Sequence, residues 1–283
     1  QGLSPAAPPA TCVSVVGAYG RARGRAIGMT SRRTTLVDEE WDMPDNNCKW
    51  KSKDFPGYKC PEPPLEGDEK GWCILHSERE DKDEGGNFEK KVKERLEGKE
   101  KIDLMGCYFP EKFPADYFEG RTFDRHVDFS EATFSQGADF FRAKFLKAAY
   151  FSKAEFSQKA NFISATFSQD ANFDVAKFSK AYFSGATFSQ VHFNRATFSQ
   201  GADFRAATFS EADFSGAEFE ESAVFGKSSF RKSAVFGRAV FKGDANFDST
   251  AFKGHIYFKW AAFRGWAFFF RNSKLTYARP EKP

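Results

Sequence analysis

Several features that would point directly to a function are scarce or missing in this sequence of 283 residues. It contains no run of about 18 apolar residues, the length needed for a helix that crosses a membrane. Its five cysteines are unevenly spaced, unlike the disulfide framework of a small secreted protein. We therefore expect a cytoplasmic protein without a membrane partner.

The residues that usually perform catalysis are equally sparse. His126, His192 and His255 have no cysteine or serine with a third orienting group at a recognisable spacing. A glycine-rich loop of the kind that binds phosphate groups is also missing. We expect a protein without enzymatic activity, and neither catalytic nor cofactor-binding residues are predicted.

The beginning of the chain differs in composition from the rest. Residues 1–37 contain no acidic residue but five arginines, and the first methionine is Met29. This composition favours a disordered basic tail over residues 1–45, with a transit peptide as the alternative. The stretch is also consistent with a fragment edge or an over-extended reading frame.

A phenylalanine recurs every five or six residues from Phe118 to Phe269, 29 times in succession. The residue two positions before each Phe is Ala in 22 of the 29 cases. Residues two apart in an extended segment point to the same side, so the Ala and Phe side chains face inward together. A straight strand cannot keep this pattern at a spacing of five, and an α-helix would split the Phe residues into two stripes. Short strands joined by turns remain, which means a β-solenoid.

The intervals between phenylalanines also predict how many sides the coil has. Eleven of the 28 intervals are six residues long, and each leads into an odd-numbered Phe counted from Phe118. Only a four-sided coil places the extra residue at the same two opposite corners on every turn. The expected fold is therefore all-β: a square coil of about seven turns.

The segment 171–188, with its alternation of Ala-Asn-Phe and Ala-Lys/Thr-Phe, resembles the Phe-centred variety of the pentapeptide-repeat family. The resemblance covers a little over half the chain, and we assign residues 102–270 to the repeat. It implies a right-handed quadrilateral β-helix that usually lacks enzymatic activity. The family does not share one function, so the resemblance implies none.

Residues 46–80 contain the only candidate site for metal chemistry. Cys48, Cys60, Cys73 and His76 offer zinc three thiolates and one imidazole, a known structural combination. The prolines and glycines between them are typical of loops that fold around an ion. The segment also resembles a short cysteine-rich module found before the repeats in some relatives. In the alternative interpretation the cysteines are reduced and pack in a loop cluster with Trp50, Phe55 and Trp72.

Residues 86–98 are expected to form an amphipathic helix. Phe88, Val92 and Leu96 lie four residues apart, Asn87 is the expected N-cap, and Gly98 is the expected stop. A solenoid needs its terminal strands covered, so we expect this helix to cap the first turn.

The surface of the repeat carries mixed charge, with 19 Lys and Arg against 16 Asp and Glu between Phe118 and Phe269. This balance makes nucleic acid an unfavourable partner and leaves a non-enzymatic protein-binding or scaffold role, with a partner of unknown identity, as the main hypothesis. One alternative is a DNA mimic that modulates a type II topoisomerase, as in some family members, although the strong negative charge is missing. A second alternative is an ice-binding surface on a ladder of Thr122, Thr166, Thr187, Thr208 and Ser229, interrupted by Lys144.

The end of the repeat is rich in aromatic residues, among them Trp260, Trp266 and Phe268 to Phe270. Residues 271–283 are expected to be a short polar tail without a capping helix. Two interpretations remain: the last turn packs against a second copy of the chain, as in relatives that dimerise at this end, or the natural chain continues beyond Pro283.

Overall fold

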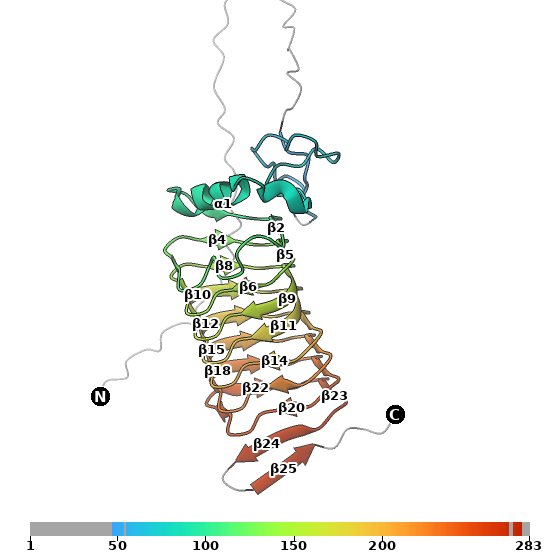
Figure 1. Cartoon of the computed structure of the whole chain (residues 1–283). Helices are drawn as coiled ribbons and strands as arrows, with labels where there is room; N and C mark the ends of the chain where they lie inside the picture. The colour runs from blue at the N-terminus through green and yellow to red at the C-terminus, as the bar shows by residue number, and fades with distance from the viewer. Residues whose placement is uncertain (1–46, 54, 272–273, 279–283) are drawn as a thin grey trace, which may run out of the picture. The chain divides into compact units, whose positions relative to one another are not determined.

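In the computed structural model, residues 47–53, 55–271 and 274–278 can be described. They form a β-solenoid of about eight turns, with one α-helix and a cysteine-rich segment at its N-terminal end (Figure 1). The basic tail expected over residues 1–45 lies outside the described residues. No helix in the described ranges has the length and apolar character needed to span a bilayer.

The strands of the solenoid form two sheets, in which every described pair is parallel except the last one. The first sheet contains β1 Ile102–Asp103, β3 Thr122–Phe123, β4 Val127–Asp128, β7 Lys144–Phe145, β8 Ala149–Tyr150, β10 Thr166–Asn172, β12 Thr187–His192, β15 Thr208–Asp213, β18 Ser229–Val235, β21 Ala251–Phe252 and β22 His255–Tyr257. The second sheet contains β2 Tyr108–Phe109, β5 Thr133–Phe134, β6 Ala138–Asp139, β9 Glu155–Asn161, β11 Lys177–Tyr182, β13 Thr197–Phe198, β14 Ala202–Asp203, β16 Glu218–Phe219, β17 Ala223–Val224, β19 Val240–Phe241, β20 Ala245–Asn246, β23 Ala262–Phe263, β24 Ala267–Arg271 and β25 Lys274–Ala278.

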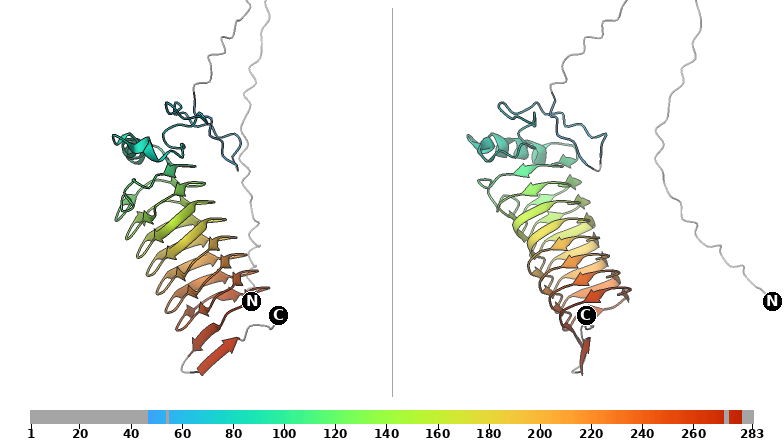
Figure 2. Two further views of the ribbon diagram at one scale, coloured as in Figure 1. Left: turned by 45° about the vertical axis from the view of Figure 1, so that its right-hand side comes forward. Right: turned by 90° about the vertical axis from the view of Figure 1, so that its right-hand side faces the viewer.

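The phenylalanine rings stack in four columns inside the coil, each ring on the fourth Phe along the chain. In one column neighbouring centroids lie 4.8 to 5.1 Å apart and the ring planes differ by 2 to 8°. That column consists of Phe118, Phe140, Phe162, Phe183, Phe204, Phe225, Phe247 and Phe269. The four-sided coil predicted from the Phe spacing is therefore confirmed, and its stacked turns are visible in Figure 2.

The coil has two kinds of corner, as the alternation of five-residue and six-residue intervals predicts. After Phe140 and Phe151 the chain makes a tight turn in which Arg142 and Lys153 adopt φ of 56° and 57°. The turn is closed by the N–H of Ala143 on the Phe140 carbonyl (3.0 Å), as in a type II turn. The extra residue of a six-residue interval lies at the other kind of corner, where β10 shifts register against β12 between Phe167 and Asp170.

The coil starts one turn earlier than the seven turns expected from the regular repeat. Strand β1 pairs with β4, and the Phe109 ring of β2 stacks on Phe134 at 4.5 Å. Residues 102–117 therefore complete a turn, although their irregular sequence hides the Phe period.

Helix α1, Asn87–Glu97, follows a short 3₁₀ helix, Glu80–Asp83, and caps the first turn. Phe88 is fully buried and its ring meets Phe109 and Phe113 edge-on at 5.7 and 5.3 Å. The expected N-cap was wrong: Gly86, at φ 72°, occupies that position and makes no side-chain cap, while Asn87 is the first helical residue. A left-handed backbone angle at this position suits glycine better than asparagine.

The phenylalanine side chains of the last turn are less buried than those in the rest of the coil. Phe252, Phe258, Phe263 and Phe269 are only partly buried. Residues 271–283 were expected to be a tail, but β25 pairs antiparallel with β24 within this range. The two strands lie at the end of the coil opposite α1 (Figure 1).

Candidate metal centre

The cysteine-rich segment folds back on itself through backbone hydrogen bonds. The Cys48 N–H donates to the Glu62 carbonyl (2.8 Å) and the Leu65 N–H to the Trp72 carbonyl (2.8 Å). A tight turn then brings His76 back over Cys73, whose carbonyl accepts the His76 N–H at 3.1 Å. These contacts bring the ends of the segment to one point.

The structure brings Cys48, Cys60, Cys73 and His76 together, as their residue types predicted. Their ligand atoms all lie within 4.8 Å of one another, and all four residues are buried. Cys60 Sγ and Cys73 Sγ are 3.7 Å apart, and His76 Nδ1 lies 3.2 Å from Cys73 Sγ and 3.3 Å from Cys48 Sγ. A tetrahedral ion with Zn–S bonds of about 2.3 Å would separate two sulfur ligands by roughly 3.8 Å. The spacing therefore fits one small tetrahedral ion.

The His76 ring is oriented for ligation. Its Nε2 lies 2.9 Å from the Met105 carbonyl oxygen. Because a carbonyl oxygen can only accept a hydrogen bond, Nε2 carries a proton. In the neutral ring this leaves the Nδ1 lone pair on the side of the sulfur atoms, where it could ligate a metal ion. Such an outer hydrogen bond is the usual partner of a metal-binding histidine.

Backbone N–H groups stabilise a negative charge on the Cys48 sulfur. The Cys73 N–H lies 3.1 Å from Cys48 Sγ and the Trp50 N–H 3.5 Å from it. Hydrogen bonds with Cys60 and Cys73 are the main reason why the pKa of Cys48 lies well below its ordinary value, against the opposing effect of burial. Burial also opposes protonation of His76, but Cys48 and Cys73 outweigh it and raise the pKa of that imidazole to about 9. Hydrogen bonds with Cys48 and Cys73 raise the pKa of the Cys60 thiol. Binding of a divalent cation by all four residues would therefore displace protons from the cluster.

A family model described as pentapeptide repeats (9 copies) matches residues 140–187, 151–197 and 183–229. This match lies within the coil, whose Phe-centred repeats are pentapeptide repeats of that family. Comparison with curated proteins found no match. The metal centre lies outside the matched residues, so its interpretation rests on its own geometry.

The metal centre is joined to the pentapeptide-repeat coil through Trp50. Its ring stacks on His76 with centroids 4.3 Å apart and planes 5° apart. On the coil side, a Cβ added to Gly106 would lie 2.0 Å from Trp50 Cζ2. Gly106 and Met105 belong to the first turn, so His76, the indole and the coil form one packed joint.

A buried lysine forms a second connection between the module and the coil. Lys82 Nζ donates to the carbonyls of Leu75 (3.2 Å), Ser77 (2.7 Å) and Tyr108 (2.5 Å). Burial lowers the pKa of Lys82 to about 8. The charged head thus holds the turn that carries His76 against strand β2.

Sequence reasoning missed Met105, Gly106 and Lys82, because nothing in their local sequence marks them. It also left open a loop cluster of Trp50, Phe55 and Trp72. Trp50 and Trp72 are partly buried against the core, whereas Phe55 is 53 % exposed and does not join them.

On the coil surface, the ladder of Thr122, Lys144, Thr166, Thr187, Thr208 and Ser229 is stacked in register as expected. Three acidic residues of the later turns, Glu211, Glu218 and Glu220, are paired with lysines on the following turn. Lys232 Nζ lies 3.0 Å from Glu211, and Lys242 Nζ lies 2.6 Å from Glu220 and 3.8 Å from Glu218. The two lysines partly offset the negative charge of the three carboxylates.

Proposed function

We propose that this chain is a non-enzymatic protein-binding scaffold, in which a rigid pentapeptide-repeat coil carries a zinc-stabilised module at its N-terminal end. The observation that carries the proposal is the joint between the two parts, where Trp50 packs between His76 and Gly106. A joint of this kind fixes a recognition module on a rod. The interior of the rod is filled by Phe and Ala side chains, so its faces and its end are the surfaces available to a partner.

The metal we propose is zinc, in a structural role. Three thiolates and one imidazole form a recognised structural zinc set, and four protein ligands leave no open position for a substrate. Burial of the four ligands supports the same role, because a site that activates substrates must be reached by them.

Affinity capture from a native lysate tests the scaffold role, comparing the zinc-loaded chain with the same chain stripped of metal. A protein that is captured by the loaded chain, and that then binds it as a purified pair, supports the proposal. A turnover activity that follows the purified chain and survives its dilution from any partner would overturn it.

The two alternative functions require different features of the coil surface. A topoisomerase-modulating DNA mimic needs a strongly acidic face, and the pairing of Glu211, Glu218 and Glu220 with lysines argues against one. Inhibition or protection of gyrase supercoiling by the purified chain would support it instead. An ice-binding face would show thermal hysteresis, and Lys144 interrupts the flat ladder that such a face requires.

We further propose that the C-terminal turn packs against a second copy of the chain. Trp260 is 67 % exposed, Tyr257 50 % and Trp266 48 %. Large aromatic side chains at one end of a rod form the kind of exposed apolar patch that marks an interface.

A further inference from the structure

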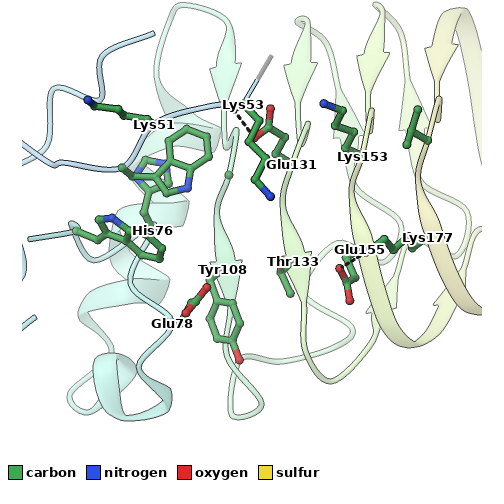
Figure 3. Close-up of a pocket in the computed structure, with 14 residues that line it drawn as sticks. Lys51, Lys53, His76, Glu78, Tyr108, Glu131, Thr133, Lys153, Glu155 and Lys177 are labelled. Carbon is green, nitrogen blue, oxygen red and sulfur yellow. Dashed lines mark hydrogen bonds and ion pairs between the residues drawn. The ribbon is translucent and has the colours of Figure 1, made fainter. Parts of the chain in front are cut away.

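A cleft of about 430 Å³ lies at the joint between the metal module and the first turns of the coil (Figure 3). Trp50, Lys51, Lys53 and Trp72 line it from the module. From the coil it is lined by a second group, which includes Tyr108, Thr133, Lys153, Val175 and Lys177. Its volume is in the range of sites that bind a small molecule or a few residues of a peptide.

We propose that this junction cleft binds an acidic peptide segment of a partner protein. The inference rests on the proposed protein-binding role and names the place and the chemistry of recognition. The cleft combines cationic groups from both parts of the molecule with aromatic walls, and both features select the same kind of ligand.

The charges of the cleft favour an anion. Four lysines line it, Lys51, Lys53, Lys153 and Lys177, against three carboxylates. The carboxylates already have partners within the chain. Glu78 pairs with Lys70 at 2.6 Å, and Glu155 pairs with Lys177 at 3.4 Å.

The third carboxylate, Glu131, is used to fasten the module to the coil. It accepts the Ser52 hydroxyl at 2.8 Å and the Lys53 N–H at 3.1 Å. It therefore positions Lys53 at the rim of the cleft, as the dashed line in Figure 3 shows. The pairing of Glu155 with Lys177 lies within the cleft, so a ligand carboxylate is attracted by the excess of lysines over carboxylates among the lining residues.

The walls of the cleft favour a peptide over a small inorganic anion. Trp50, Trp72 and Tyr108 are only partly buried, and Val175 is 40 % exposed. Aromatic side chains with one covered and one open face are typical anchors for side chains of a protein partner. A segment that alternates acidic and apolar residues matches both the lysines and these rings.

The same features make nucleic acid the less favoured ligand. A phosphodiester chain needs a concentrated basic footprint, and here the lysines share one open cleft with Glu78, Glu131 and Glu155. We therefore expect recognition of scattered carboxylates rather than of a continuous row of phosphates.

The cleft shares a wall with the metal centre. Trp50 and His76 both line it, and the two rings are stacked on each other. Removal of the ion frees the His76 ring and with it the indole. Ligand binding should consequently depend on the metal, although the four residues that would hold the ion are themselves buried.

Panning a random-peptide phage library against the full zinc-loaded chain tests this proposal. We expect the enriched peptides to carry net negative charge and aromatic or aliphatic residues. We also expect the double reversal Lys53→Glu with Lys153→Glu to weaken their binding by about tenfold or more. Glutamate suits position 153, because Glu131 already adopts the same turn conformation at φ 58°.

The matched control is Lys147→Glu, an exposed lysine that does not line the cleft, and it should retain the affinity. Enrichment of neutral or basic peptides, equal binding by the double reversal, or no enrichment would each overturn the proposal. Preferential binding of single-stranded DNA that the double reversal abolishes would also overturn it, in favour of nucleic acid.

Failure of the cleft proposal can be distinguished from failure of the scaffold role. A captured partner that binds the double reversal as tightly as the parent chain keeps the scaffold role and overturns the cleft. A partner lost from the double reversal but kept by Lys147→Glu supports both.

Discussion

The Trp50 indole lies flat on the His76 imidazole, with ring centroids 4.3 Å apart, and its far edge lies against Gly106. A residue of the metal module is thus held between a candidate metal ligand and the backbone of the first turn. The predictions about the module and its cleft follow from this contact, and the others concern the coil itself.

Replacing Gly106 with Ala should separate the module from the coil. The new Cβ would lie 2.0 Å from Trp50 Cζ2, so the indole must move away. We expect a loss of about 1 to 3 kcal/mol in the free energy of unfolding, measured by urea denaturation, together with a red shift of tryptophan fluorescence. Gly120→Ala is the matched control. Its φ is also 64°, but no atom lies within 4 Å of the added Cβ. Equal losses for both variants would mean that backbone strain alone explains the effect.

A phenylalanine in the middle of the coil should contribute more to the free energy of unfolding than one at its end. Phe193 is fully buried and stacks between Phe173 at 4.9 Å and Phe214 at 5.0 Å. Phe193→Ala should cost about 3 to 5 kcal/mol of unfolding free energy. Phe258→Ala, at a ring that is only partly buried, should cost clearly less. The comparison uses chemical denaturation, and a larger loss at Phe258 would contradict the packing described here.

Val175 occupies a corner position with φ 60°, which a β-branched residue adopts only with strain. Val175→Gly should therefore raise the thermal midpoint, by an amount equivalent to about 1 kcal/mol. The reverse change, Gly185→Val, is made at φ 67° in an equivalent corner and should lower it. Calorimetry on both variants checks the pair, and a lower midpoint for Val175→Gly would show that its side-chain contacts outweigh the strain.

The proposed C-terminal interface predicts a dimer. Trp260 is the most exposed large apolar side chain of the last turn, at 67 %. Light scattering at micromolar concentration should give twice the chain mass, and Trp260→Glu should return it to the monomer. Lys147→Glu, away from this end, should remain dimeric. A monomeric parent chain would contradict the interface.

Much of the coil could be predicted from spacing, because each turn repeats the same local rule. The interval lengths alone fixed four columns and placed the extra residue at alternate corners. The first turn lies within the predicted range 102–270 but was not counted among the seven turns, because Leu104, Phe109 and Phe113 fill it without the regular period. Asn87 was misassigned as N-cap because the left-handed angle of Gly86 depends on the turn before it.

The metal centre could be predicted in part. Three cysteines and one histidine within one short segment were enough to select Cys48, Cys60, Cys73 and His76. The surrounding contacts were beyond reach, since Met105 and Gly106 meet His76 and Trp50 only after the coil has formed. Lys82 was missed for a similar reason. A lysine is normally predicted to lie on the surface, and the three carbonyls that accept its hydrogen bonds come together only in the folded chain.

The central claim is that the four ligands hold one zinc ion that fixes the module to the coil. Zinc K-edge X-ray absorption on the purified chain, with metal content measured in parallel, tests it most directly. We predict one zinc per chain with three sulfur neighbours at about 2.3 Å and one nitrogen at about 2.0 Å. Cys73→Ser should lose the ion, whereas Cys107→Ala, a buried cysteine outside the cluster, should keep it. A chain that binds no zinc when folded, or one whose zinc survives Cys73→Ser with unchanged sulfur coordination, would contradict the account.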